Sequence, residues 1–338
     1  MRAAVTTAVD RLEILDVPDP VPDGRALVRM VRAGICGTDL KILSGAIPVD
    51  RPRVLGHELY GRVVQAAPGG HLTAGQAVLV DPTVSCGRCQ PCRYGRVQLC
   101  ARGGLMGRDL DGGFADSIAV DERQLLPVPD AVDPDEAALL QVLGTCVHGQ
   151  DRLEVQPGRP AAVIGLGVTG LLHLQILRAR GAAPIIAITR SEEKRRKAEE
   201  LGAHVTAAPD DAVAAVTEAT GGSGVDVVVE SVGKTQTLRQ AIDLAGLGAR
   251  ILMYGIISET QAELPFYDLY FKELDLINCR AAAPRDYQGA IDLAASGQVR
   301  LRPLISASIP FGDAGDAIDR LTNERGILKV ILDLEDAA

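Results

Sequence analysis

The sequence lacks tryptophan, long apolar runs and an excess of basic charge. Tryptophan is absent from the 338 residues and aromatic side chains make up only 3%, but neither shortage decides the chemistry. No uninterrupted apolar run reaches the roughly eighteen residues of a transmembrane helix. The first fifteen residues also lack the apolar core of a secretory signal. We therefore expect a cytoplasmic protein without a membrane anchor.

Basic residues are too few for a nucleic-acid-binding protein. The chain has 35 Lys and Arg against 44 Asp and Glu, which gives a formal net charge of -9. Binding to phosphate backbones requires clustered positive charge, so we expect neither nucleic acid nor membrane as a partner. A hydrophobic fraction of 47% is typical of a globular chain, and the length favours two domains.

Seven cysteines are too few, in a chain this long, to indicate a disulfide framework, which is typical of small secreted domains. Four of them follow the pattern C-x2-C-x2-C-x7-C: Cys86, Cys89, Cys92 and Cys100. Four thiolates satisfy the tetrahedral preference of Zn²⁺ and leave no open position, so this pattern predicts a structural zinc lobe at about 84–102. An iron–sulfur or redox role is the alternative, but the spacing differs from that of common ferredoxins.

A second set of metal-binding residue types lies nearer the N-terminus. Cys36 stands in GICGTD, and His57 and Glu58 stand in LGHELYG. Each residue alone is compatible with a buried side chain of no catalytic importance. Together they offer the thiolate, imidazole and carboxylate of an open zinc site, with a fourth position for water or an alcohol. Zinc lowers the pKa of bound water to about 7 and would likewise favour ionisation of an alcohol.

The two parts of the chain show different periodicities. Up to about residue 129, short β-rich runs at 27–31, 61–66, 77–80 and 116–120 predict a β-barrel-like domain. A helix is expected over 133–153, with Asp133 as N-cap and Pro134 at the first helical position. Strands at 161–164, 184–189, 225–230, 250–254 and 274–278, with helices between several of them, predict a doubly wound parallel sheet. From about residue 283 we expect helix, strand, helix and strand, returning to the first domain.

A glycine turn follows the strand at 161–164. Gly165, Gly167 and Gly170 form G-x-G-x-x-G, with Val168 and Thr169 between the last two glycines at the start of a helix. In this strand–turn–helix context the motif predicts a dinucleotide site, because the glycines allow close backbone approach and the helix N-terminus attracts pyrophosphate. The alternative is a glycine-rich turn without a ligand.

The end of the following strand favours NADP over NAD. NAD-binding folds usually carry an acid about twenty residues past the turn, and the residue here is Thr189. Thr189 and Ser191 can donate hydrogen bonds to a 2′-phosphate, Arg190 can offer a planar charged fork, and Lys194 can add a second charge. The alternative is that Arg190 and Lys194 are solvated, since Glu192 and Glu193 lie beside them.

In their order along nearly the whole chain, GICGTD, LGHELYG, the four-cysteine lobe, GGFADSIAV and VIGLGVTG resemble the zinc-dependent medium-chain dehydrogenase/reductase family. The GHE motif is most similar to the sorbitol and threonine dehydrogenase branches. The resemblance implies an α/β protein with a GroES-like catalytic domain (1–144 and 283–338), a Rossmann cofactor domain (145–282), and assembly into homodimers or homotetramers.

The resemblance also implies residue roles. Cys36, His57 and Glu58 match catalytic zinc ligands, and Thr38 matches the hydroxyl that passes the alcohol proton outward. Asp39 matches an acid that supports the zinc ligands, and Thr145 matches a contact to the nicotinamide.

The sequence departs from the family at three places. Lys41 stands where several members carry a relay histidine, so proton release is expected through Thr38, the cofactor ribose and water. Gln141 replaces a Glu that can approach zinc, which removes a negative charge. Ala282 and Ala283 replace an Arg-Tyr pair found in polyol dehydrogenases.

These features predict a zinc-dependent, NAD(P)-dependent alcohol dehydrogenase or reductase. The leading hypothesis is oxidation of a secondary alcohol, of polyol, cyclitol or amino-alcohol type, to a ketone. One alternative is a biosynthetic carbonyl reductase working in the opposite direction. Another is a non-catalytic nucleotide-binding member, which the presence of Cys36, Thr38, His57 and Glu58 disfavours.

Overall fold

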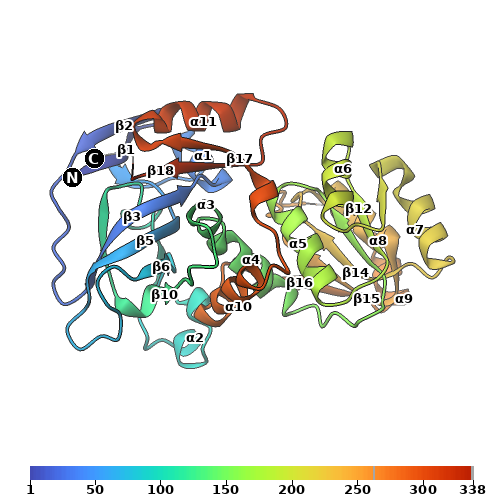
Figure 1. The fold of residues 1–338 in the computed structure, drawn as a ribbon. Helices are drawn as coiled ribbons and strands as arrows, with labels where there is room; N and C mark the ends of the chain where they lie inside the picture. The colour runs from blue at the N-terminus through green and yellow to red at the C-terminus, as the bar shows by residue number, and fades with distance from the viewer. Residues whose placement is uncertain (262, 336–338) are drawn as a thin grey trace. The chain divides into compact units, whose positions relative to one another are not determined.

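The computed structural model describes residues 1–261 and 263–335, which separate into two compact units (Figure 1). The first unit contains Met1–Gly144, Ala281–Ala295 and the chain from Leu301 onward. The second contains Thr145–Arg280 and Ser296–Arg300. None of the described helices is long and apolar enough to span a bilayer.

The first unit is mostly β-structure. Its largest sheet has the strand order β10-β6-β5-β3-β18-β17, with β9 also paired to β3. These strands are β3 (Ala26–Gly34), β5 (Glu58–Gln65), β6 (Ala77–Val80), β9 (Ser117–Val120), β10 (Leu125–Pro127), β17 (Ile305–Pro310) and β18 (Lys329–Asp333). Smaller sheets contain β1 (Arg2–Ala8), β2 (Arg11–Asp16) and β4 (Arg53–Val54), and β7 (Thr83–Val84) and β8 (Gly104–Leu105). The helices of this unit are α1 (Gly37–Leu43), α2 (Gln90–Arg93), α3 (Pro134–Ala137), α10 (Pro284–Ala295) and α11 (Ala314–Asn323).

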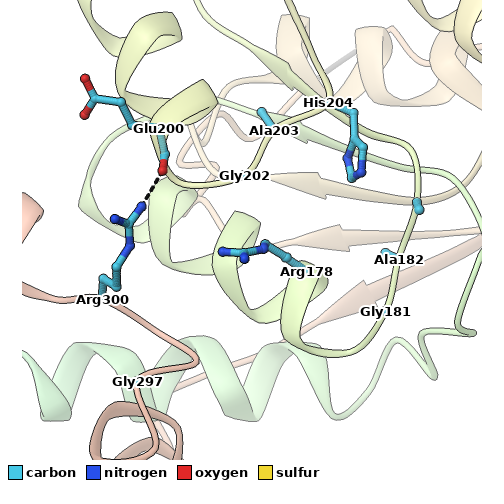
Figure 2. Close-up of a pocket in the computed structure, with 10 residues that line it drawn as sticks. Arg178, Gly181, Ala182, Glu200, Gly202, Ala203, His204, Gly297 and Arg300 are labelled. Atoms are coloured by element: carbon cyan, nitrogen blue, oxygen red, sulfur yellow. Dashed lines mark hydrogen bonds between the residues drawn. The ribbon is translucent and has the colours of Figure 1, made fainter.

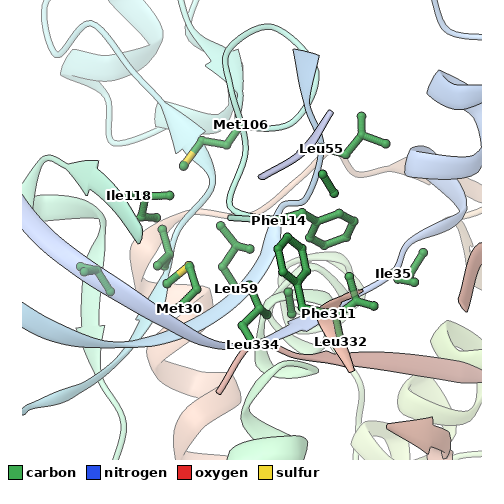
Figure 3. Close-up of a cluster of buried hydrophobic side chains, with 14 of the residues drawn as sticks. Met30, Ile35, Leu55, Leu59, Met106, Phe114, Ile118, Phe311, Leu332 and Leu334 are labelled. Atoms are coloured by element: carbon green, nitrogen blue, oxygen red, sulfur yellow. The ribbon is translucent and has the colours of Figure 1, made fainter. Parts of the chain in front are cut away.

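The core of the first unit joins segments that are far apart in the sequence. Phe114 and Phe311 are at most 1% exposed and pack in the same cluster as Leu59 and Leu332 (Figure 3). Gly56, at φ +98°, gives Phe114 room, because a Cβ there would lie 2.2 Å from the ring. The C-terminal strands are therefore part of the same core as the N-terminal ones, which closes the unit on itself.

The second unit is built on a six-stranded parallel sheet of order β13-β12-β11-β14-β15-β16. The strands are β11 (Ala161–Ile164), β12 (Ile185–Ile188), β13 (Val205–Ala207), β14 (Val225–Glu230), β15 (Ala245–Met253) and β16 (Asp275–Asn278). The helices are α5 (Val168–Ala179), α6 (Glu192–Glu200), α7 (Ala212–Thr220), α8 (Thr235–Leu244) and α9 (Phe266–Phe271), and most of α4 (Leu140–Gln150). The strand order reverses between β11 and β14, so right-handed connections put α5 and α6 on one face and α7 and α8 on the other.

Most predicted elements are present, including the strands at 77–80, 161–164 and 225–230 with the same bounds. Asp133 caps α3, since its side chain accepts a hydrogen bond from the Asp135 N–H at 2.9 Å, and Pro134 is the first helical residue. The single helix expected over 133–153 was wrong, because the chain breaks into α3 and α4.

The expected return of the whole tail to the first domain also needs correction. The return begins at Ala281, and Ser296–Arg300 belongs to the second unit. The physical reason is a pair of hydrogen bonds between the buried Gln175 side chain and the backbone of Arg300: the Arg300 N–H donates to Oε1 at 2.8 Å, and Nε2 donates to the Arg300 carbonyl at 3.1 Å.

Candidate functional site

Cys36, His57 and Glu58 lie together in the first unit. Cys36 follows β3 and is the N-cap of α1, while Glu58 is the first residue of β5. β3 and β5 pair antiparallel with Gly34 opposite Glu58, so the end of one strand lies beside the start of the other. One ligand atom from each of the three side chains lies within 4.8 Å of the other two.

This group of side chains fits a metal ion. The Nδ1 atom of His57 is buried and has no hydrogen-bond partner, although Asp39 Oδ1 is 3.4 Å away. Burial opposes the imidazolium form, but Asp39 and Cys36 together raise the pKa of His57 well above its ordinary value. A buried imidazole between a thiol and two carboxylates is an environment that stabilises positive charge, which a zinc ion would supply.

Asp39 supports this site through the backbone. It is fully buried, and its Oδ2 accepts a hydrogen bond from the Cys36 N–H at 2.9 Å. Its Oδ1 accepts a longer bond, 3.4 Å, from the N–H of Gly56. The Asp39 carboxylate thus connects the backbone of Cys36 with that of Gly56, the residue before His57.

Lys329, which was not predicted from the sequence, lies on β18. Its Nζ donates hydrogen bonds to both carboxylate oxygens of Glu58, at 2.9 and 2.7 Å, and to the carbonyl of Ile35 at 3.0 Å. Lys329 and Glu58 are 4% and 1% exposed, so the ion pair is buried. Burial disfavours the ammonium form, but Glu58, Cys36 and Asp39 together outweigh it and raise the pKa of Lys329. Any metal bound by Glu58 therefore shares that carboxylate with Lys329.

In protein without zinc at this site, replacing Lys329 with methionine is expected to lower the free energy of unfolding by about 3–5 kcal/mol, because it leaves the Glu58 carboxylate buried and unpaired. Urea unfolding of the two proteins measures the difference. Lys234→Met, at an exposed lysine, is the control and should change stability by less than about 0.5 kcal/mol. Equal losses in the two variants would contradict a stabilising role for the ion pair.

Three other residues expected near this site, Thr38, Lys41 and Gln141, differ in their burial and in their hydrogen bonds. Thr38 lies in the first turn of α1, is partly buried, and makes no hydrogen bond to the described residues through its hydroxyl. Lys41 is exposed on the same helix. Gln141 is buried, and its Nε2 donates to the hydroxyl of Tyr287 at 3.4 Å, so the amide that replaces the expected Glu has a neutral partner.

The four cysteines of the predicted lobe converge. Their sulfur atoms lie within 4.8 Å of one another, with Cys89 Sγ 3.3 Å from Cys92 Sγ and 3.7 Å from Cys100 Sγ. Tetrahedral zinc with Zn–S bonds of about 2.3 Å requires sulfur atoms about 3.8 Å apart. Backbone N–H groups of Arg88 and Cys89 lower the pKa of the Cys86 thiol to about 6, which favours the thiolate. The tetrad fits a structural zinc ion.

The glycine turn lies at the carboxyl end of β11, where the strand order of the sheet reverses. Gly165 adopts φ +90°, which favours glycine, and a Cβ on Gly170 would lie 1.8 Å from the Gly165 carbonyl oxygen. Gly167 is the N-cap of α5, Val168 and Thr169 form its first turn, and Thr169 Oγ1 lies 2.8 Å from Ser231 Oγ. A glycine turn that leads into a helix N-terminus is the arrangement that favours anion binding in dinucleotide folds.

The segment after β12 holds the residues expected at the ribose. Thr189 follows the strand, Arg190 is exposed, and Ser191 caps α6 by accepting a hydrogen bond from the Lys194 N–H at 3.4 Å. Arg195, which was not predicted from the sequence, donates a hydrogen bond from Nη1 to the Thr189 carbonyl at 2.8 Å. Its position one turn into the helix could have suggested a third positive charge.

Two further expectations concern the second unit and the return segment. The hydroxyl of Thr145 lies 2.7 Å from that of Tyr254, a residue that sequence reasoning did not single out. Burial raises the pKa of Tyr254 well above its ordinary value, so the phenol remains protonated. Ala282 and Ala283, at the positions of the polyol-associated pair, are buried and carry no charge.

Comparisons with known proteins agree with this arrangement. The family model of the alcohol dehydrogenase GroES-like domain matches residues 22–130, and that of the zinc-binding dehydrogenases matches residues 168–296. The chain is 33% identical over 304 residues to the 2-dehydro-3-deoxy-L-galactonate 5-dehydrogenase of Pseudoalteromonas atlantica, with 89% of each chain covered. It is 30% identical over 345 residues to the sorbitol dehydrogenase of Bacillus subtilis, covering 98% of this chain and 97% of that one.

Solved structures are also similar over the whole chain. One is described as a zinc-binding dehydrogenase of Sinorhizobium meliloti bound to NADP, with a TM-score of 0.91, 35% identity and 98% of both chains covered. An alcohol dehydrogenase of Escherichia coli complexed with NADH has a TM-score of 0.91 at 27% identity, covering 98% of this chain and 99% of that one.

The chain therefore belongs to the zinc-dependent medium-chain alcohol dehydrogenase family. It is an NAD(P)-dependent oxidoreductase that uses zinc and acts on small-molecule alcohols or the corresponding carbonyls. The predicted family, the GroES-like and Rossmann folds and the enzyme class are confirmed.

Proposed function

We propose that this enzyme oxidises a secondary alcohol of a polyol or sugar acid to a ketone, using NADP and two zinc ions per chain. The observation that carries the proposal is the convergence of Cys36, His57 and Glu58, with Thr38 two residues after Cys36 in the first turn of α1. The relatives named for galactonate and sorbitol dehydrogenation support the substrate class. One site catalyses both directions, so reduction of the ketone is the same proposal run in reverse.

The proposed site residues have three roles: binding zinc, transferring the alcohol proton and positioning a ligand. Cys36, His57 and Glu58 would hold the catalytic zinc, and Cys86, Cys89, Cys92 and Cys100 the structural one. When bound, zinc supplies a Lewis acid that favours loss of the alcohol proton, and the nicotinamide supplies the hydride acceptor. Thr38 takes up that proton and passes it outward, and Lys329 holds the Glu58 carboxylate in place. Exposed Lys41 does not extend this path as a histidine would.

The second unit is proposed to bind the dinucleotide through residues of three segments. The turn Gly165, Gly167, Val168, Thr169 and Gly170 would bind the pyrophosphate. Thr145, fixed by Tyr254, would contact the nicotinamide. Thr189, Arg190, Ser191 and Lys194 would bind the adenosine ribose and its 2′-phosphate.

The NADP preference rests on charge at the end of β12. No acid occupies position 189, where a carboxylate would repel a 2′-phosphate. Arg190 and Lys194 have no ion-pair partner among the described residues, whereas Glu192 is paired with Arg196. Arg195 adds a third positive charge at the same loop. Basic residues therefore outnumber acids over residues 189–195, where the ribose is proposed to bind.

We expect kcat/KM to be higher with NADP than with NAD, in a screen of secondary alcohols and ketones followed by nicotinamide absorbance. Arg190→Ala should lower kcat/KM for NADP by about tenfold or more, because it removes charge-assisted hydrogen bonds, and should leave that for NAD unchanged. Arg239→Ala, at an exposed arginine of α8, is the control. A wild-type preference for NAD would refute the cofactor assignment.

We also infer that the chain forms homo-oligomers. Phe266, Tyr267, Tyr270 and Phe271 of α9 are 65–83% exposed, and the neighbouring β16 is the edge strand of the parallel sheet. Exposed aromatic clusters and open sheet edges are typical of surfaces that pair with another chain.

A further inference from the structure

The second unit contains a cavity of about 830 Å³ away from the glycine turn (Figure 2). It is lined by the C-terminal ends of α5 and α6 and by the segments that lead into β12 and β13, together with Gly297 and Arg300. The cavity therefore lies at the amino edge of the parallel sheet, whereas the glycine turn follows the carboxyl end of β11. It is separate from the proposed dinucleotide site.

One wall of the cavity carries a firmly held arginine. The backbone of Arg300 is bound on both sides by the side chain of Gln175, which is 1% exposed. The Arg300 guanidinium donates a hydrogen bond to the backbone carbonyl of Glu200, as Figure 2 shows. The Arg300 side chain is exposed, and this bond engages only part of its five N–H donors.

The cavity is also lined by a second arginine, Arg178, and by His204, both of them exposed. The Arg178 side chain crosses Gly202, where an added Cβ would lie 2.5 Å from its Cδ. Its guanidinium has no hydrogen bond or ion pair to the described residues. The Nδ1 atom of His204 accepts a hydrogen bond from the Ile185 N–H at 3.0 Å, which leaves Nε2 as the protonated nitrogen and a donor.

The cavity has an unbalanced positive charge. Glu200 is the acid among its lining residues, but its carboxylate pairs with Lys197 at 2.9 Å and points away from the two guanidinium groups in Figure 2. Two guanidinium groups that line one cavity repel each other unless an anion lies between them. The chain as a whole is acidic, with a formal net charge of -9, so a cavity lined by two arginines differs from its overall charge.

We propose that this cavity binds the phosphoryl group of a small anion between Arg178 and Arg300, with His204 as a third donor. Guanidinium groups form forked, charge-assisted hydrogen bonds to phosphate oxygens. Donors from three residues suit the several oxygens of a phosphoryl group better than the two of a carboxylate. The volume also accommodates the organic part of a phosphate monoester.

The test is calorimetric titration of the full chain, saturated with its nicotinamide dinucleotide so that the phosphate sites of the glycine turn and of β12 are filled. The probes are inorganic phosphate and glycerol 3-phosphate. Wild-type protein should bind one equivalent, and Arg178→Gln and Arg300→Gln should each weaken binding by about tenfold or more, because each loses a charge-assisted contact. Arg159→Gln, at an exposed arginine paired with Asp226, should bind as wild type does.

The two probes distinguish the sources of the phosphoryl group. Tighter binding of glycerol 3-phosphate identifies a monoester as the ligand, and tighter binding of inorganic phosphate identifies the free ion; both results support the site. Absence of saturable binding to wild-type protein would overturn the proposal, as would equal affinity in wild type and both cavity variants.

Discussion

Replacing Cys36 with serine is expected to abolish turnover and to remove one of two zinc equivalents per chain. The two sets of ligand residues share no member and lie in different parts of the first unit. A serine hydroxyl is a much weaker zinc ligand than a thiolate, so the open three-residue site should lose its metal while the four-cysteine lobe keeps its own. Metal analysis of the purified variant, together with an activity assay, measures both effects.

Two further variants test whether the loss of zinc is specific to the site that contains Cys36. Cys279→Ser alters a cysteine outside both sets and should retain two equivalents and full activity. Cys100→Ser should instead lose the other equivalent and unfold more easily, because zinc binding to the lobe contributes folding free energy. Retention of two equivalents by Cys36→Ser would contradict the assignment of the three ligands.

Replacing Thr38 with alanine is expected to lower kcat by about 10²- to 10⁴-fold while both zinc equivalents remain, since general acid–base groups contribute rate factors of this size. Thr38 follows the proposed ligand Cys36 by two residues on α1, and its hydroxyl is not engaged by the described residues. It is therefore available to exchange a proton with the bound alcohol. Steady-state kinetics with the best substrate and zinc analysis give the two readouts.

The conservative variant separates proton transfer from packing. Thr38→Ser keeps the hydroxyl and should retain most of the turnover, whereas Thr38→Val keeps the shape and should behave like alanine. An unchanged kcat in Thr38→Ala would exclude the hydroxyl from the proton path.

Local motifs in the sequence predicted much of the candidate site. The spacing of Cys86 to Cys100 is short, so a single loop with α2 can bring the four sulfurs together. The glycine turn could likewise be predicted from the sequence, because its strand, turn and helix are contiguous along the chain. Cys36 and Glu58 lie close together because β3 and β5 pair antiparallel. The sequence does not specify the register of that pairing, so the two residues were grouped through the family resemblance.

Contacts between distant segments could not be read in this way. Lys329 reaches Glu58, 271 residues away, because β18 pairs with β3 so that Ile331 lies opposite Gly34. Nothing near Lys329 in the sequence specifies that register. Gln175 and Arg300 meet through a segment that sequence periodicity assigned to the other domain. The break between α3 and α4 was missed because both halves have helical periodicity.

The most direct test of zinc-dependent hydride transfer uses a secondary alcohol carrying deuterium on its carbinol carbon. Zinc-loaded enzyme is predicted to place that deuterium in the reduced nicotinamide, one per ketone formed, as mass spectrometry would detect. Protein depleted of the ion at Cys36, His57 and Glu58 should transfer none until zinc is restored. Deuterium transfer at the same rate in depleted and zinc-loaded protein would contradict the account.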